Sequence, residues 1–234
     1  MKTSTQITDT IATAQIADAC MRLKIPFRWA PTGIKPVAPV DRMIYGQAVP
    51  ARHYGSVDVF FEALENSTPG GILVIDNGGR QDEACIGDLA VLEVREAGLR
   101  AMVVWGLHRD TTELIEIGLP VFSYGSCPAG PSRLDIQEPE ALASARFGDF
   151  LVTGQDMVFA DSDGVVFVES SRIEQVMEMA ASIREAERKQ VEALSGGENL
   201  RQQFQFQEFL KHRESDPELT FRKHLRALSR SIEE

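Results

Sequence analysis

Residues 71–127 alternate between short apolar runs and helical segments, and this alternation constrains the fold more than any other feature of the chain. Apolar runs typical of buried strands occupy residues 71–77, 101–107 and 121–127. Segments with helical spacing, each closed by a glycine, occupy residues 87–98 and 111–118. Strands that alternate with short helices predict an α/β fold with a mixed, largely parallel sheet covered by helices.

The segments before residue 71 add two predicted helices around an irregular stretch. Residues 7–23 and 57–66 carry apolar side chains at helical spacing. Residues 26–50, rich in proline and glycine, are typical of a loop with a short strand. Together with residues 71–127 they predict a compact layered sandwich.

The segments after residue 147 predict a hairpin followed by helices. Residues 147–170 alternate between apolar and polar side chains, and Ser162-Asp163-Gly164 predicts the hairpin turn. Residues 171–194 return to helical spacing, and the polar remainder predicts two further helices around Pro217. We therefore expect a catalytic α/β domain over residues 1–195. Residues 196–234 are expected to form a helical extension, for which an oligomerisation arm is favoured over a lid on a neighbouring subunit or additional packing.

The bulk composition excludes several classes of partner. The net charge of −11 at pH 7 does not favour nucleic acid. No apolar run approaches about eighteen residues and the start of the chain is polar, so we expect no membrane association. The three cysteines, Cys20, Cys85 and Cys127, match no metal-binding spacing and favour a reduced, cytoplasmic setting.

Asp88 is followed, after twenty residues, by the adjacent pair Arg109 and Asp110. The helix predicted between them descends about 15 Å at 1.5 Å per residue. The strand that follows climbs back about 20 Å at 3.3 Å per residue. The three side chains should therefore meet beyond the carboxyl ends of neighbouring strands, the edge at which open α/β sheets bind ligands.

This corner has the chemistry of a site for a small α-keto acid. Two carboxylates suit a hard divalent cation such as Mg²⁺, and Arg109 offers a rigid fork to an anionic oxygen. Backbone N–H groups at the start of the helix, around Gly87 to Ala90, add an anion cradle. A metal that chelates the keto and carboxylate oxygens would stabilise an enolate as a Lewis acid.

Each residue also has a structural interpretation. Asp110 with Glu113 forms a plausible capping box, which is the favoured interpretation of Asp110 taken alone. Asp88 could stabilise a helix dipole, and Arg109 could be a surface residue paired with Asp110. His108 is typical of a solvated histidine at a strand end. Only the joint placement of Asp88, Arg109 and Asp110 favours a function.

The run PGGILVIDN…GDLAVLEVREAGLRAMVVWGLHRDTTELIEIGLPVFSYG closely resembles the RraA-like family, which contains 4-hydroxy-4-methyl-2-oxoglutarate aldolase and the regulator of ribonuclease activity A. A carboxylate, twenty residues and then Arg-Asp is the signature of the catalytic members. The resemblance covers about residues 10–175. It implies an α/β sandwich related to swivelling phosphohistidine domains, assembled as a homotrimer or hexamer with active sites at subunit interfaces.

The resemblance also implies roles for the individual residues. It makes the chain a class II, metal-dependent aldolase that releases pyruvate from a 4-hydroxy-2-oxo acid and also decarboxylates oxaloacetate. Asp110 would bind the cation, which is Mg²⁺, Mn²⁺ or another divalent ion. Asp88 would hold a metal-bound water or a proton-relaying water, and Arg109 would bind the keto or enolate oxygen. The backbone of Gly87, Asp88, Leu89 and Ala90 would bind the pyruvyl carboxylate.

The lysines give an independent argument about mechanism. All six are outside residues 36–188, at Lys2, Lys24, Lys35, Lys189, Lys211 and Lys223. A class I aldolase needs a lysine for its Schiff base, so this distribution disfavours imine chemistry.

Two other functions were weighed. A non-catalytic regulator that binds and inhibits an RNA-degrading enzyme fits the acidic charge but does not require the Asp-Arg-Asp set. A methyltransferase would want a glycine-rich nucleotide loop, and DNGGRQ is a poor candidate. The chain also departs from the family it resembles in two ways: Trp105 stands where many members have Asp in a Val-Asp-Gly sequence, and the polar stretch after about residue 195 is longer than in the shortest members.

Overall fold

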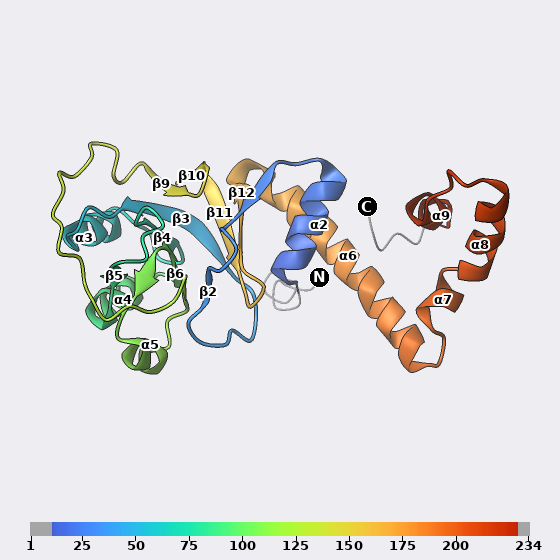
Figure 1. Ribbon diagram of the computed structural model, residues 1–234, viewed down its shortest axis with the longest axis horizontal. Coiled ribbons are helices and arrows are strands. Elements are labelled where there is room, and N and C mark those ends of the chain that lie inside the picture. The colour runs from blue at the N-terminus through green and yellow to red at the C-terminus, as the bar shows by residue number, and fades with distance from the viewer. Residues whose placement is uncertain (1–10, 229–234) are drawn as a thin grey trace.

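The computed structural model describes residues 11–228, and its centre is an eight-stranded mixed sheet (Figure 1). In spatial order the strands are β1 (Phe27–Trp29), β12 (Val165–Glu169), β11 (Asp156–Ala160), β3 (Ile44–Arg52), β4 (Ile72–Asp76), β6 (Ala101–Trp105), β8 (Val121–Ser123) and β2 (Lys35–Pro36). The mixed α/β fold is confirmed. Within this sheet, parallel pairing is limited to β3, β4, β6 and β8; the predicted hairpin β11–β12 joins β3 antiparallel, and β1 and β2 also pair antiparallel at the two edges.

Alternating side chains of the central strands build two separate cores. On β4, Leu73 and Ile75 face helices α3 (Asp58–Glu65) and α4 (Asp88–Glu96). Ile72 and Val74 face the hairpin β9 (Ser144–Phe147) and β10 (Phe150–Thr153). Because successive strand residues point to opposite faces, a strand covered on both sides must be apolar throughout, as residues 71–75 are.

Two strands differ from the prediction: the strand expected within residues 26–50 is longer than expected, and residues 84–86 also form a strand. The nine-residue β3 contains Pro50, yet β11 pairs only with its first part, residues 44–47. The missing N–H of Pro50 therefore costs no ladder hydrogen bond on that side. The short strand β5 (Ala84–Ile86) pairs in parallel with β7 (Leu107–His108), which Gly106 separates from β6. Strands this short carry too little periodicity to be recognised.

The helices expected near both ends of the chain are present. α2 (Thr13–Leu23) corresponds to the helix predicted over 7–23, of which residues 7–10 lie outside the described part. α5 (Thr111–Ile117) and α6 (Ile173–Ser195) also match their predicted segments. α6 packs on α2 and the hairpin through Val176, Ala180 and Ile183. No helix in the described part is both long and apolar enough to cross a membrane.

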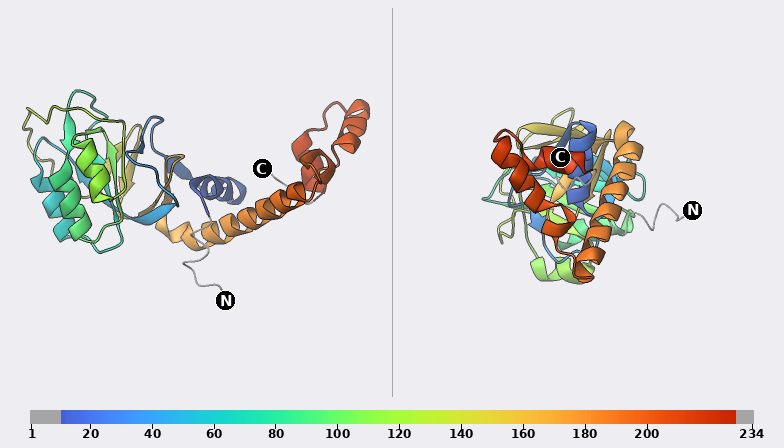
Figure 2. Two further views of the ribbon diagram at one scale, coloured as in Figure 1. Left: turned by 90° about the horizontal axis from the view of Figure 1, so that it is seen from below. Right: turned by 90° about the vertical axis from the view of Figure 1, so that its right-hand side faces the viewer.

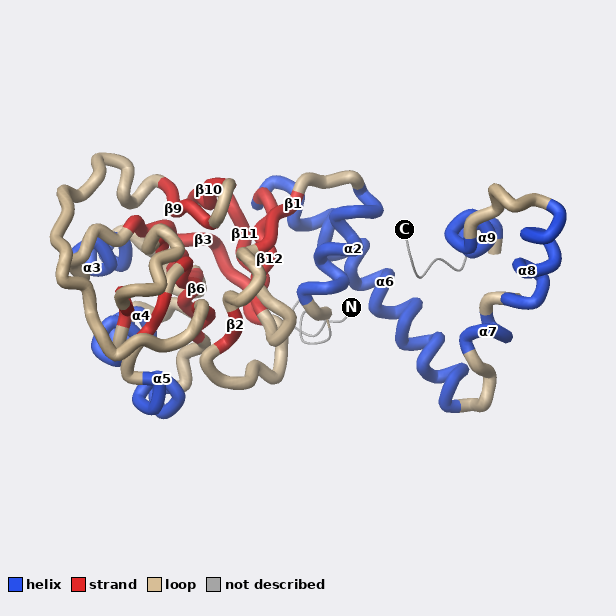
Figure 3. The backbone as a smooth tube through the Cα atoms, in the orientation of Figure 1, coloured by secondary structure: helices blue, strands red, loops and turns tan. Residues whose placement is uncertain are grey.

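Beyond Ile183, α6 projects from the body and carries three short helices at its far end (Figures 1, 2 and 3). These are α7 (Leu200–Gln203), α8 (Phe206–Ser215) and α9 (Phe221–Ala227). They share a small core in which Phe209 and Leu225 are buried. Ser195, the last residue of α6, is also the last residue of the predicted catalytic domain.

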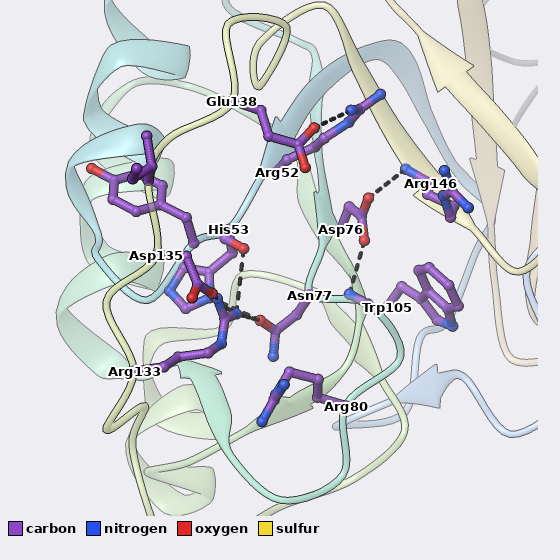
Figure 4. A pocket seen from close by; sticks show the side chains of 13 residues that line it. Arg52, His53, Asp76, Asn77, Arg80, Trp105, Arg133, Asp135, Glu138 and Arg146 are labelled. Atoms are coloured by element: carbon purple, nitrogen blue, oxygen red, sulfur yellow. Dashed lines mark hydrogen bonds and ion pairs between the residues drawn. The ribbon is translucent and has the colours of Figure 1, made fainter.

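A buried polar network ties the ends of β3 and β4 to the segment around Arg133 (Figure 4). Asn77 Oδ1 accepts hydrogen bonds from Arg133 Nη2 at 2.9 Å and from His53 Nδ1 at 2.8 Å. Arg133 can only donate, which fixes the oxygen of Asn77 toward it and the proton of His53 on Nδ1. Arg133 Nε donates to the buried carboxylate of Glu83 at 3.0 Å.

The network makes stability depend on pH through His53. Burial lowers the pKa of His53, and the charge of Arg133 lowers it further. The hydrogen bond to Asn77 and the charges of Glu83 and Asp58 raise it less. Below the ordinary histidine pKa, His53 is therefore protonated in the unfolded chain but still neutral in the folded protein. The stability that is present above the ordinary pKa is lost as the pH falls toward the lower pKa of His53 in the folded protein.

We expect the urea midpoint of unfolding to fall between about pH 7.5 and pH 5 and to fall less in His53→Gln, because that variant has no imidazole to protonate at this site. His212→Gln, which removes an exposed histidine of α8, should keep the wild-type pH profile. Identical profiles for His53→Gln and wild type would contradict this linkage.

Candidate active site

The pairing of β5 with β7 brings the predicted site residues to one corner. Ile86 lies opposite His108 in this pair, and Arg109 N–H donates to Ile86 O at 3.0 Å. α4 begins at Asp88, directly after β5, and α5 begins directly after Asp110. Asp88, Arg109 and Asp110 therefore lie together, as the helix and strand lengths predicted.

The carboxylate of Asp110 is the centre of this corner. Its Oδ2 accepts a hydrogen bond from the backbone N–H of Asp88 at 3.3 Å and lies 3.4 Å from Arg109 Nε. A Cβ on Gly87 would lie 2.2 Å from the same oxygen. Gly87 is therefore needed for the close approach of Asp110, and not for its own backbone dihedrals, which are extended.

Asp110 does not cap α5, so the capping-box interpretation is wrong. It occupies the N-cap position, but its side chain makes no capping hydrogen bond. Its backbone is in the left-handed region, with φ 59° and ψ 42°, which is uncommon for a residue other than glycine. This conformation turns the carboxylate away from α5 and toward the start of α4. Strain of this kind persists where the surroundings enforce it, often at functional sites.

His108 is buried, which contradicts the expected solvated histidine. Its Nδ1 lies 2.7 Å from Ser123 Oγ and its Nε2 lies 3.0 Å from Thr111 Oγ1. Burial lowers the pKa of His108, and the negative charge of Asp110 opposes this by raising it. The ring thus links β8 to the first residue of α5 and fixes the turn that carries Arg109 and Asp110. The sequence held no signal for this role.

Arg109 borders a cavity of about 420 Å³. Its side chain is half exposed and passes over Gly130, where a Cβ would lie 2.9 Å from Nη1. The backbone from Gly87 to Ala90 lines the same cavity. The sequence did not identify its apolar wall, to which the half-exposed Val57 and Phe61 of the α3 region contribute. Apolar walls around a few polar groups are typical of small-molecule sites.

The backbone N–H groups expected to bind an anion at the start of α4 already donate hydrogen bonds to carboxylates. Asp88 N–H donates to Asp110, and Leu89 N–H donates to Asp88 Oδ1 at 2.8 Å. Leu89 is 73% exposed, so this helix start lies at the surface and not in a core. The geometry shows that negatively charged oxygens are accommodated at this helix start.

The donor set suits a cation that needs few protein ligands. Within residues 11–228, no three His, Cys, Asp or Glu side chains converge on a common point. Asp110 and Asp88 would supply carboxylate oxygens only, and Mg²⁺ accepts such a set because it keeps several waters. The Asp110 side chain is 34% exposed, so water and substrate can reach it. Mn²⁺ accepts the same oxygen ligands.

Adding a methyl group at Gly87 should displace Asp110 from its position in the candidate site. Gly87→Ala must displace the Asp110 carboxylate, and we expect any turnover that depends on this carboxylate to fall by at least about 100-fold, because small misplacements of reacting groups have effects of this size. Gly154→Ala is the matched control, because its nearest atom would be Ala48 O at 4.0 Å. Wild-type kinetics in Gly87→Ala would show that the position of Asp110 is unimportant.

The family model described as RraA-like, Aldolase/RraA, matches residues 13–167. The uncharacterized protein MJ0644 of Methanocaldococcus jannaschii is 26% identical over 171 residues, which cover 72% of this chain and 81% of the relative. The "Putative 4-hydroxy-4-methyl-2-oxoglutarate aldolase" of Aromatoleum aromaticum is 32% identical over 145 residues, which cover 59% of this chain and 89% of the relative. The resemblance found in the sequence is confirmed.

Solved structures share the fold. RraAS2 of Streptomyces coelicolor, described as an unusual member of the RNase ES inhibitor RraA protein family, superposes with a TM-score of 0.66 at 23% identity. That match covers 78% of this chain and 92% of the other. An uncharacterized protein from Pseudomonas syringae gives a TM-score of 0.71 at 22% identity, covering 85% and 96%. Sequence identities this low show a common fold, and they give no information about the activity of this chain.

Proposed function

The chain belongs to the RraA-like, Aldolase/RraA family, and from this premise we propose that it is a divalent-metal-dependent carbon–carbon lyase. Its substrate would be a 4-hydroxy-2-oxo acid, cleaved to pyruvate and a carbonyl product, with oxaloacetate decarboxylation as a second activity. The observation that carries the proposal is the Asp110 carboxylate, held by a left-handed backbone against Asp88 and Arg109 instead of capping its helix.

Each residue of the corner has a role in such a cleavage. The 4-hydroxyl would give its proton to a water as the bond between C3 and C4 breaks and C4 becomes the carbonyl carbon. The electron pair would remain on the pyruvyl fragment as an enolate, whose C3 then takes a proton from water to give pyruvate. The Arg109 guanidinium would lie at the enolate oxygen and stabilise its charge. Asp88 would hold the water that relays protons, and the Gly87–Ala90 backbone would bind the pyruvyl carboxylate.

A divalent cation held by Asp110 and by water would supply Lewis-acid stabilisation of the developing negative charge. Imine chemistry is disfavoured, because no lysine lines the cavity of Arg109. Lys35, at β2, donates its Nζ hydrogen bond to the carbonyl of Asp163 in the β11–β12 turn.

The decisive measurement is pyruvate release from oxaloacetate by chelator-treated protein, with and without added Mg²⁺ or Mn²⁺. We expect metal-dependent release that falls by more than about 100-fold in Asp110→Asn and in Arg109→Ala, since each removes charge stabilisation of the transition state. Glu116→Gln, which changes an exposed carboxylate of α5, is the control and should retain activity.

Retained activity in Asp110→Asn would refute the assignment of this residue. Absence of release with either metal would instead favour the regulator of an RNA-degrading enzyme, the alternative function in this family, and binding to such an enzyme would be measured next.

We also propose that the chain forms a homotrimer or hexamer with active sites at its interfaces, and that residues 196–234 contribute to assembly as an arm. The far half of α6 supports this, because Val191 and Leu194 are 59% and 39% exposed. Isolated apolar side chains on a surface are common, but a projecting helix that ends in its own small core presents them for contact.

Introducing charge on this face should weaken assembly. We expect the double variant Val191→Glu, Leu194→Glu to show a lower mass than wild type by light scattering, because the carboxylates could not be buried in a contact. Ser182→Glu, at an exposed position of the same helix, should leave the mass unchanged. An unchanged mass in the double variant would exclude this face from the interface.

A further inference from the structure

A second cavity, of about 540 Å³, lies where β3, β4 and β6 end (Figure 4). Asp76 and Asn77 form its floor at the end of β4, and Trp105 stands beside them at the end of β6. It shares no lining residue with the cavity of Asp88 and Arg109. The proposed lyase chemistry makes no use of it.

The side chain of Asn77 has an unsatisfied donor at this cavity. Asn77 is 2% exposed and its Oδ1 is bonded by His53 and Arg133, but Nδ2 has no hydrogen-bond partner among the described residues. Figure 4 shows this nitrogen pointing from the cavity wall toward Arg80. A buried polar group without a partner is costly, and most such groups in native proteins are satisfied. An acceptor from a ligand would remove this cost.

Arg80 and Arg146 line this cavity and carry the positive charge that a negatively charged acceptor would need. Arg80 pairs with Asp82 at 2.6 Å and lies 3.5 Å from Glu83 Oε1, yet its side chain remains 40% exposed. Arg146 donates its backbone N–H to Asp76, while its exposed guanidinium has no ion pair within the described chain. Arg80 lies on the Asn77 side of Asp76 and Arg146 on the other side, so a guanidinium group borders each end of the cavity (Figure 4). A guanidinium group beside an amide donor suits a carboxylate.

The remaining walls restrict the net charge of the ligand. Four arginines line the cavity against three acidic residues, Asp76, Asp135 and Glu138. Asp76 accepts backbone N–H groups of Gly78 and Arg146 at 2.8 and 2.9 Å, and Glu138 pairs with Arg52 at 2.6 Å. These carboxylates would repel a polyanion but accept hydrogen bonds from hydroxyl groups. The ring of Trp105 offers an apolar face beside them.

We propose that this cavity binds a hydroxylated carboxylic acid of about the size of a six-carbon sugar acid, a size that suits a pocket of a few hundred Å³. Its carboxylate lies between Asn77 Nδ2 and the guanidinium group of Arg80, and Arg146, on the other side of Asp76, donates to a hydroxyl oxygen farther along the ligand (Figure 4). Its hydroxyls donate to the acidic residues, and its carbon skeleton packs on Trp105. The site is separate from the corner at Asp110 and goes beyond the lyase function.

Gluconate is the probe, and fluorescence of Trp105 is the readout. The chain has two tryptophans, so a Trp29→Phe background, which removes the exposed ring of β1, leaves Trp105 as the only reporter. We expect gluconate to change the emission saturably and inorganic phosphate to neither mimic nor compete at equal concentration. Isothermal titration calorimetry on the protein with Trp29 intact should give the same affinity.

Two variants test the assigned orientation of the ligand. Asn77→Asp preserves shape but replaces the donor by a negatively charged oxygen, and Arg146→Ala removes a side chain without an ion pair in the described chain. Each should weaken gluconate binding by at least about tenfold, the usual effect of losing a charge-assisted hydrogen bond. Arg184→Ala on α6 is the matched arginine control, and Asp110→Asn tests separation from the other cavity; both should bind gluconate as wild type does.

Several results would overturn the proposal. Absence of a saturable signal excludes a hydroxy acid ligand, and equal binding of phosphate reduces the site to a general anion site. Loss of binding in Asp110→Asn places gluconate in the catalytic corner. Wild-type affinity in Arg146→Ala excludes the assigned orientation, and this variant remains informative even if Asn77→Asp fails to fold.

Discussion

The parallel pairing of β5 with β7 is the contact on which the candidate active site depends. It involves few residues, yet it sets the starts of α4 and α5 side by side and brings Asp110 against Gly87. A longer strand or a larger residue at position 87 would separate the two helix starts. The position of Asp110 therefore depends on a short backbone ladder and on the absence of one methyl group, in a two-stranded sheet separate from the eight-stranded one.

The sequence predicted those parts whose physical signal is repeated over many residues. The buried strands β4 and β6, the helices α3, α4 and α6 and the hairpin β11–β12 each carry enough periodicity or turn chemistry to be recognised. The meeting of Asp88 with Arg109 and Asp110 was also predictable, because a helix and a strand of known rise return the chain to one edge. Their catalytic roles came from family resemblance and stay predictions.

Other features could not be predicted, because they depend on contacts distant in sequence. The full length of β3 was missed because it contains Pro50, which costs no hydrogen bond to β11 since β11 pairs only with residues 44–47. His108 carries no local sign of burial between Ser123 and Thr111. The left-handed backbone of Asp110 reverses the capping role that its position suggests, and only the surrounding structure reveals it. The second cavity joins the ends of β3, β4 and β6 with β9 and residues 133–138, which no linear pattern links.

The direction of α6 determines which subunit the C-terminal arm can contact. The helix leaves the body at the end opposite α3, α4 and α5 (Figure 1), and its last twelve residues extend about 18 Å past Ile183. A continuous helix cannot fold back, so α7, α8 and α9 cannot close over the Asp88–Arg109 cavity of their own chain. Any influence of the arm on catalysis must act in trans, on the cavity of another copy.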